Sequence, residues 1–463
     1  MIKNVISVID GAAGSCGKAK VIGELVTLED IIVGAAIANC MPNAGHTYVD
    51  ENGNKTVFRN LPVSIINPKT ELFIGPGSAI DMDVFLDEIN RVKHLLNGRK
   101  VYIHELVPII EGRHKEYERE HIKTGSTFKG CGAVMQEKVM RNPNLKNFKD
   151  LKDLNGLEDY VVCCSDDEWM DRLYEHLDNS NEHVILEVPQ GCDLSLNSSS
   201  YPYVTSRDIS TSQFLDYSKI SPERLLQTIM VIRPFPIRIN NITSDGEYIY
   251  TGSYGNGREL TWSEVSIASQ LGIYPYEGIL DDYKSEDIYD FDEWMKDYYK
   301  DCPEIYLKQI FKNDYKDTVP ENITFLQAVE LERLYYKSQG IRDYESGLLE
   351  LPLTEFKDKT SGILDLSEQT TVTKKERRIF DLDIKRLIKN CKANTPSSLY
   401  LNFFQQLDNS FAGMKGNYEK IYIEKHLRGY LEWLEDATNV EISALGTGAR
   451  NGERIKRKEL IRR

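Results

Sequence analysis

The sequence contains no long hydrophobic run, no excess of basic residues and no metal-type cysteine spacing. Its 463 residues include 57 Lys and Arg against 72 Asp and Glu, which gives a formal net charge of −15. This balance argues against a nucleic-acid partner, because non-specific binding needs a basic surface. The eight cysteines form no Cys-x-x-Cys motif, so neither a zinc site nor a redox motif is expected. Without a signal-like or membrane-spanning segment, we expect a cytoplasmic protein with reduced thiols and no membrane partner.

Residues 11–20 form a glycine-rich segment, Gly-Ala-Ala-Gly-Ser-Cys-Gly-Lys-Ala-Lys. The apolar residues 5–9 before it predict a buried strand, and residues 21–26 after it predict the start of a helix. In a strand–turn–helix arrangement the N–H groups of the turn converge on an anion, and Lys18 can reach a phosphate as a point charge. The spacing departs from the Walker A pattern, because Ala12 precedes Gly17 by five and Ala19 follows the lysine. These residues alone are equally compatible with a phosphate site and with an ordinary tight turn.

A second segment, residues 43–47, reads Asn-Ala-Gly-His-Thr, and a series of short motifs follows it along the chain. They are Leu61-Pro62, Ile74-Gly75, Thr127 to Gly132 with Lys138 and Arg141, Glu187 to Gly191, Tyr201 to Ser206, Pro234 to Pro236, Thr370-Thr371 with Arg377-Arg378 and Asp383, Leu407-Asp408, and Gly446 to Gly448. In this order the motifs resemble those of the adenylosuccinate synthetase family. The resemblance implies an α/β fold with a large, mostly parallel central sheet flanked by helices, and a homodimer.

The resemblance also implies a reaction and a set of site residues. A nucleoside triphosphate phosphorylates the 6-oxygen of a purine nucleotide, and the amine of L-aspartate displaces that phosphate, with Mg²⁺ as cofactor. Catalytic roles would fall to Ser15, Lys18, His46 and Gln190. Triphosphate contacts would come from Gly14, Gly17, Lys18, Ala19, Lys20, Gly45, His46 and Thr47. The acceptor nucleotide would be held by Ser15, Asn43, Thr127, Gln190 and Thr205, with Arg141 supplied by the neighbouring subunit. Aspartate would be bound by Thr371, Arg377 and Arg378. The donor base would be bound by Gln406, Asp408, Gly446 and Gly448. The metal ion would be bound by Ser15 and Gly45.

The first loop departs from the family pattern at two adjacent positions. The family carries Asp and Glu where this chain has Ser15 and Cys16. A serine hydroxyl is not acidic near pH 7 and is a poorer Mg²⁺ ligand than a carboxylate. A shorter, neutral residue leaves room for the 2-amino group of guanine and can accept a hydrogen bond from it. The family has a phage branch with this replacement, which couples dGMP to aspartate using ATP, and the chain resembles that branch.

We therefore predict a ligase that acts on dGMP or GMP, the ribo and deoxy forms being equally compatible with the sequence. Two alternatives stay open: an ordinary adenylosuccinate synthetase acting on IMP or dIMP, and a catalytically dead nucleotide-binding sensor. Guanine-reading members of the family carry Thr-Lys-Leu-Asp, whereas residues 405–408 read Gln-Gln-Leu-Asp. The loss of the lysine, which packs on the guanine plane, favours ATP as donor.

The interval between the Pro234 motif and the arginine block is much longer than in the family. Residues 290–310 and 325–338 show helical periodicity, so we predict a mainly helical insertion over residues 241–366. The synthetase core would then consist of residues 1–240 and 367–463.

Overall fold

A computed structural model describes residues 1–122, 124–154, 156–242, 246–262, 265–266, 269, 366–369, 376–423 and 425–461, without the side chains of 425 and 426. The helices predicted over 290–310 and 325–338 lie outside the described residues, as does Thr371. The division of the chain at residues 240/241 and 366/367 stays a prediction.

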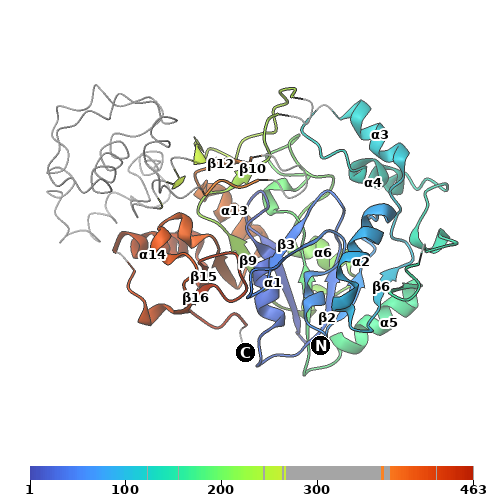
Figure 1. Ribbon diagram of the computed structural model, residues 1–463, viewed down its shortest axis with the longest axis horizontal. Coiled ribbons are helices and arrows are strands. Elements are labelled where there is room, and N and C mark those ends of the chain that lie inside the picture. The colour runs from blue at the N-terminus through green and yellow to red at the C-terminus, as the bar shows by residue number, and fades with distance from the viewer. Residues whose placement is uncertain are drawn as a thin grey trace.

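An 11-stranded sheet forms the centre of the molecule (Figure 1). All its neighbouring strands run parallel except β15 and β16, which are antiparallel. The predicted mostly parallel α/β fold is therefore confirmed. In spatial order the strands are β14 (Gly416–Asn417), β16 (Arg454–Lys456), β15 (Ile442–Gly446), β13 (Ser398–Leu401), β9 (Leu225–Ile232), β1 (Val5–Asp10), β8 (His183–Glu187), β2 (Val33–Ala38), β5 (Glu71–Ile74), β6 (Val101–His104) and β7 (Val161–Cys164).

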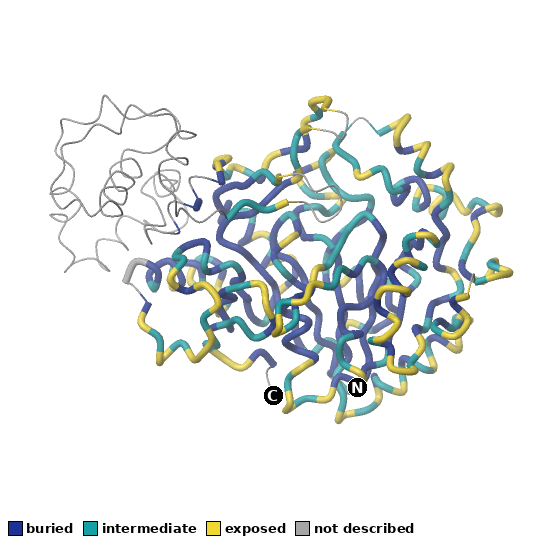
Figure 2. The backbone as a smooth tube through the Cα atoms, viewed as in Figure 1, coloured by how far each residue is buried: buried dark blue, intermediate teal, exposed yellow. Residues whose placement is uncertain are grey.

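The central strands are mostly apolar because helices cover a parallel sheet on both faces. All residues of β1 and β2 are buried, and Figure 2 shows buried backbone concentrated through the middle of the molecule. The described α-helices are α1 (Lys18–Val26), α2 (Met82–Leu96), α3 (Gly112–His121), α4 (Cys131–Val139), α5 (Asp166–Leu177), α6 (Thr211–Tyr217), α13 (Ile384–Asn394) and α14 (Lys425–Thr438).

Local sequence explains where several of these elements begin. Ser165 and Glu168 form a reciprocal capping box at the start of α5, and the carboxylate of Asp383 caps α13, which satisfies otherwise unpaired N–H groups. The predicted strand over residues 5–9 is β1, and the helix predicted after the glycine-rich turn is α1, which begins earlier than expected, at Lys18. The lysine of the loop is therefore the first residue of a helix.

Two small antiparallel units lie outside the main sheet. Strands β3 (His46–Val49) and β4 (Lys55–Phe58) form a hairpin. Strands β10 (Ile237–Arg238), β12 (Arg378–Phe380) and β11 (Glu259–Leu260) form a three-stranded sheet in that order. In Figure 1, β10 and β12 lie together above β9.

The carboxyl ends of the parallel strands meet at one edge of the sheet, which is where open α/β folds bind ligands. The first loop follows β1, Gln190 follows β8, Arg233 follows β9, Asn402 follows β13, and Gly446 ends β15. The topology therefore brings together segments that are hundreds of residues apart in the sequence.

Candidate active site

The loop between β1 and α1 has the backbone shape of an anion-binding turn. Gly14 and Gly17 have φ angles of 89° and 84°, in the left-handed region, which glycine adopts without a steric penalty. Ser15 between them has a φ of 61° and is exposed at the tip of the loop. A Cβ on Gly17 would lie 2.1 Å from the Nδ2 atom of Asn402, so the loop also needs glycine there for close packing against β13.

Asp10, which the motif comparison did not single out, lies inside this loop. Its carboxylate accepts hydrogen bonds from the N–H groups of Ala12, Gly14 and Cys16 at 3.0, 3.2 and 2.8 Å. Its Oδ2 atom is also 3.4 Å from the Lys18 ammonium nitrogen. The signal for this residue was an acid at the end of a buried strand, directly before a glycine-rich turn.

Lys18 and Gln190, both predicted to be catalytic, are in contact. The Lys18 ammonium donates a hydrogen bond to the backbone carbonyl of Gln190. Gln190 follows β8 with a φ of 58°, and its buried Oε1 atom has no hydrogen-bond partner among the described residues. A Cβ on Gly191 would lie 2.2 Å from the carbonyl oxygen of Ala12, which shows how closely the loops after β1 and β8 pack.

His46 is the first residue of β3, directly after Gly45. Burial, together with the nearby Lys18 ammonium, lowers the pKa of His46 to about 3, so its imidazole is neutral at physiological pH. The Nε2 atom lies 3.8 Å from the Cys40 sulfur. A neutral imidazole can donate one N–H hydrogen bond to an oxygen that is acquiring negative charge.

Ser15 faces two arginines. Its hydroxyl contacts the guanidinium of Arg377, and its backbone carbonyl accepts a hydrogen bond from Arg233 at 3.0 Å. The structure thus places a predicted aspartate-binding residue, Arg377, beside a predicted acceptor-binding residue. The adjacent Cys16 is fully buried, and burial and Asp10 raise the pKa of its thiol, which makes it a small core residue without reactive character.

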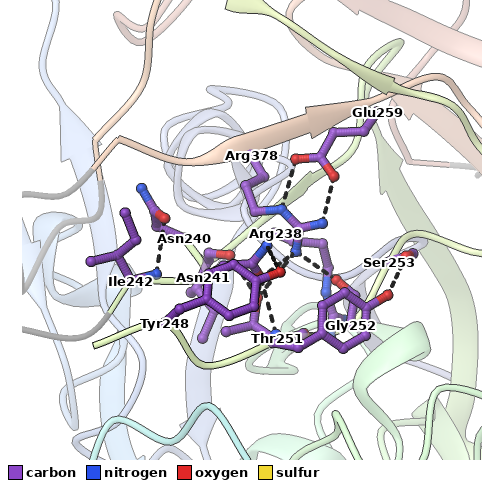
Figure 3. A network of polar contacts seen from close by, with 12 residues as sticks. Arg238, Asn240, Asn241, Ile242, Tyr248, Thr251, Gly252, Ser253, Glu259 and Arg378 are labelled. Carbon is purple, nitrogen blue, oxygen red and sulfur yellow. Dashed lines mark hydrogen bonds and ion pairs between the residues drawn. The ribbon is translucent and has the colours of Figure 1, made fainter. Parts of the chain in front are cut away.

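Arg378 is held within the protein (Figure 3). Its Nε and Nη2 atoms donate to the two carboxylate oxygens of Glu259 at 2.8 and 2.5 Å. Its Nη1 atom donates to the Gly252 carbonyl at 2.7 Å and to the Asn241 side chain at 2.9 Å. Arg378 therefore ties β12 to β11 and to the segment after β10, and it supports Arg377 from the neighbouring position.

The residues predicted to bind the donor base lie around the ends of β13 and β15. Gln406 is buried and forms hydrogen bonds with Arg233 and with Glu368, each at 3.2 Å. Asp408 accepts a hydrogen bond from the Ser410 N–H at 2.8 Å. A Cβ on Gly448 would lie 2.2 Å from the carboxylate of Glu453.

Gly446 ends β15 and has Asn402 and Lys20 close by. A Cβ on Gly446 would lie 2.0 Å from the Asn402 Oδ1 atom and 2.9 Å from the Lys20 ammonium. Lys20 donates to the Glu453 carbonyl at 2.6 Å and lies 3.6 Å from the Glu24 carboxylate. Burial lowers the pKa of Lys20. Its ammonium thus points beneath the end of β15, whereas that of Lys18 points into the loop.

The remaining predicted residues lie on the loops that border this edge. Thr47 and Thr127 are exposed, Asn43 and Thr205 are half-buried, and Ala19 is buried in α1. Arg141 is exposed after the end of α4, with a φ of 55°. A Cβ on Gly125 would lie 2.5 Å from the Thr251 side chain, so the segment that carries Thr127 lies against the arginine network of Figure 3.

The described residues form no group of three or more His, Cys, Asp and Glu arranged to hold a metal ion. Within the same part of the chain, no helix is long and apolar enough to cross a membrane.

Comparison with known proteins defines the class. The sequence profile of adenylosuccinate synthetase matches residues 8–165. Two relatives are N6-succino-2-amino-2′-deoxyadenylate synthases. The one from Acinetobacter phage SH-Ab 15497 is 31% identical over 58% of this chain and 75% of its own length. The one from Vibrio phage phiVC8 is 33% identical over 58% of this chain and 76% of its own length. The adenylosuccinate synthetase of Methanococcus aeolicus is 31% identical over 62% of this chain and 78% of its own.

Two solved structures share the fold. Cyanophage S-2L succinoaminodeoxyadenylate synthetase (PurZ), bound to dGMP and dATP as an energy donor, has a TM-score of 0.64 at 22% identity, covering 98% of this chain and 96% of its own. Fully ligated adenylosuccinate synthetase from Plasmodium falciparum has a TM-score of 0.63 at 15% identity, covering 98% of this chain and 100% of its own. The protein is a C–N ligase of purine nucleotide metabolism. More narrowly, the chain belongs to the adenylosuccinate synthetase family.

Proposed function

We propose that the protein couples L-aspartate to carbon 6 of a guanine nucleotide, dGMP or GMP, at the expense of a nucleoside triphosphate. The product would be N6-succino-2-aminodeoxyadenylate or its ribo counterpart. The observation that carries this proposal is Ser15, a short neutral residue exposed at the tip of the first loop. The names of the phage relatives support the same acceptor.

Ser15 provides space and a polar partner where the family carries a carboxylate. Its hydroxyl can accept a hydrogen bond from the 2-amino group of guanine. Asp10, the acid that precedes the loop, has a fully buried side chain, so it does not restore a carboxylate at the loop surface. A guanine ring can therefore approach the loop along its N1–C2 edge.

The two chemical steps assign roles to the residues around the loop. In the first step the bond between the γ-phosphorus and the bridging oxygen breaks, the γ-phosphoryl group moves to the 6-oxygen, the nucleoside diphosphate leaves and the N1 proton is released to solvent. The Lys18 cation and the His46 N–H would stabilise the developing charge. In the second step the amine of aspartate attacks carbon 6 and phosphate leaves. Arg377 is suited to bind an aspartate carboxylate, together with Thr371. Gln190 would orient the acceptor beside Lys18.

The other predicted contacts complete the proposed site. The triphosphate would lie along the first loop and the hairpin start, contacting Gly14, Gly17, Lys18, Ala19, Lys20, Gly45, His46 and Thr47. The acceptor would be held by Ser15, Asn43, Thr127, Arg141, Gln190 and Thr205. The donor base would meet Gln406, Asp408, Gly446 and Gly448, and Arg378 would support the aspartate site.

Mg²⁺ fits this arrangement as a companion of the triphosphate. Magnesium keeps several water ligands and binds to substrate phosphates together with one or two protein groups, usually carboxylates, so in this site the phosphates would be its main ligands. The Ser15 hydroxyl and the Gly45 carbonyl supply neutral oxygens of this kind. The metal would neutralise charge on the transferring phosphoryl group. We further propose a cytoplasmic homodimer in which Arg141 of each subunit reaches the acceptor phosphate bound to the other.

A substrate matrix tests the proposal. Purified protein is incubated with aspartate, Mg²⁺ and each pairing of IMP, dIMP, GMP or dGMP with ATP or GTP, and succinylated products are identified by mass spectrometry. We expect products from guanine nucleotides. A preference for IMP or dIMP would identify an ordinary adenylosuccinate synthetase, and tight nucleotide binding without product from any pair would identify a sensor.

The variant Ser15→Asp provides a matched control for the steric argument. The aspartate restores a longer charged side chain at the loop tip, so guanylate turnover should fall relative to that of wild type. Improved guanylate turnover in this variant would contradict the role given to Ser15.

A further inference from the structure

The carboxylate of Asp10 fills the inside of the phosphate loop. The Oδ1 atom accepts hydrogen bonds from the N–H groups of Ala12 and Gly14 at 3.0 and 3.2 Å. The Oδ2 atom accepts one from Cys16 at 2.8 Å and lies 3.4 Å from the Lys18 ammonium. Four donors from one short segment thus surround a single carboxylate.

Burial removes Asp10 from direct contact with any ligand. The side chain of Asp10 is 0% exposed and that of Lys18 is 5% exposed. Both carboxylate oxygens already have two donors, and a buried ionised carboxylate is stable only with such partners. Asp10 is therefore neither a substrate base nor a metal ligand in this geometry, and any functional effect must pass through the groups that it holds.

Lys18 is the charged group that Asp10 holds. Its ammonium is shared between the Asp10 carboxylate and the Gln190 backbone carbonyl. Positions 15 and 16 of the loop carry Ser and Cys, so they supply no carboxylate. Among the described residues, Asp10 is the carboxylate that forms an ion pair with Lys18. The pair directs the ammonium toward the space between the loops that follow β1 and β8.

We propose that Asp10 is a positioning residue for the donor nucleotide, which holds the Lys18 ammonium directed into the loop until the triphosphate arrives. This inference rests on the proposed function, in which Lys18 binds the triphosphate. The negative charge of Asp10 is essential to it. An asparagine of the same shape would place its amide donor either beside the Ala12 and Gly14 N–H groups or beside the Cys16 N–H and the Lys18 ammonium, so in both orientations it would repel groups that Asp10 attracts.

The chain offers a matched control for the turn itself. Asp50 accepts hydrogen bonds from the N–H groups of Asn52 and Asn54 at 2.9 and 2.8 Å in the exposed β3–β4 turn, and no ion pair with a lysine is formed there among the described residues. Asp50→Asn therefore tests the loss of charge at an aspartate-stabilised turn without the lysine. Asp10→Asn tests the same change with the lysine present.

The experiment is a double-mutant cycle read out by equilibrium binding of Mg·ATP and Mg·GTP to the full-length protein. Asp10→Asn should weaken binding of the preferred donor about tenfold or more, the scale of one charge-assisted hydrogen bond. Asp50→Asn should leave binding unchanged. In a Lys18→Gln background, which already binds more weakly, Asp10→Asn should have little further effect because its partner has been removed.

Other outcomes would overturn the inference. Unchanged donor affinity in Asp10→Asn, with weakened affinity in Lys18→Gln, would show that Asp10 does not act on Lys18. If Asp10→Asn lowers donor affinity equally in the wild-type and Lys18→Gln backgrounds, Asp10 only shapes the backbone of the loop. If Lys18→Gln binds the donor as tightly as wild type does, Lys18 does not bind the triphosphate. That result contradicts the proposed function at this residue, and the inference about Asp10 is then wrong as well. Should Asp10→Asn not fold, Asp10→Ser keeps an oxygen acceptor for the turn without the charge and carries the same expectation.

Discussion

Arg233 donates a hydrogen bond to the backbone carbonyl of Ser15 at 3.0 Å from a guanidinium that is completely buried. The same guanidinium forms an ion pair with Glu368 at 2.5 Å and a hydrogen bond with Gln406 at 3.2 Å. Phe403 covers it, with the ring centroid 4.1 Å away. One buried cation thus joins the first loop, the segment that carries Glu368 and the segment that carries Gln406.

Replacing this cation should affect several substrates at once. Arg233→Met removes the guanidinium partner of the Ser15 carbonyl and of Glu368, which keeps its hydrogen bond from Gln406. Breaking a fully buried pair costs about 3–5 kcal/mol, and the cost should be smaller here because the Glu368 side chain is 24% exposed. We expect a lower melting temperature and higher KM values for both aspartate and the donor. Arg457→Met removes a similar two-bond pair with Glu435 directly after β16, so it should lower stability and leave both KM values unchanged. A KM change for only one substrate would argue against the link through Arg233.

His46→Ala should lower kcat while nucleotide binding survives. A positioned proton donor or hydrogen-bond donor contributes about 10²–10⁴-fold to the rate, and His46 is neutral because burial lowers its pKa to about 3. Steady-state kinetics and equilibrium binding of the donor separate the two effects. His46→Asn, which keeps an N–H donor, should retain more activity than His46→Ala. Unchanged turnover in both variants would remove His46 from the mechanism.

Gly17→Ala should disrupt the first loop. Its φ of 84° and the 2.1 Å approach of the Asn402 amide leave no space for a Cβ. Gly98→Ala is a matched control, since Gly98 has a φ of 80° but nothing within 4 Å of an added Cβ. The control should cost about 1 kcal/mol through backbone strain alone. We expect Gly17→Ala to cost more and to weaken donor binding, as measured by thermal unfolding and equilibrium titration.

Stability should fall as the pH rises from about 5 to about 7, partly through Glu88. Burial raises the pKa of Glu88 from 4.5 to about 7, so in this window the folded state holds a proton that the unfolded chain has released. The folded state therefore loses stability as the pH rises through this range. Thermal unfolding at pH 5 and pH 8 should show a smaller pH effect in Glu88→Gln than in wild type. The exposed residue Glu51, changed to Gln, controls for net charge and should retain the wild-type pH effect.

ATP should support turnover at least as well as GTP. Gln406 is held by Arg233 and Glu368 and stands where guanine-reading relatives carry lysine. Asp408 is the opposing influence, because a carboxylate accepts well from the N1–H and N2–H donors of guanine. Asp408→Asn should therefore reduce kcat/KM for GTP more than for ATP. A GTP advantage above about tenfold in wild type, or roughly 1.4 kcal/mol, would show that Asp408 decides the donor.

The sequence was sufficient to predict the strand, the glycine-rich turn and the helix around Lys18, because these depend on local periodicity and on glycine placement. The mostly parallel sheet followed from the ordered family motifs. Asp10 and Arg233 were not found, because their partners are fixed by how the ends of β1, β9 and β13 meet in space. The direction of the Lys20 side chain also depends on a partner that is distant in the sequence, because its ammonium donates a hydrogen bond to the backbone carbonyl of Glu453. The site assignments taken from the motifs stay predictions until the variants are measured.

The position of β1 has a consequence for synthesis of the chain. Its two neighbours in the sheet are β8, at His183–Glu187, and β9, at Leu225–Ile232. A ribosome delivers the apolar first strand long before either partner exists, so the strand must wait without its native hydrogen bonds. The loop that follows it also packs against Asn402, so it can take its final shape only after β13, at Ser398–Leu401, has emerged. The first loop is therefore completed only by segments made much later, although its own residues are translated well before them.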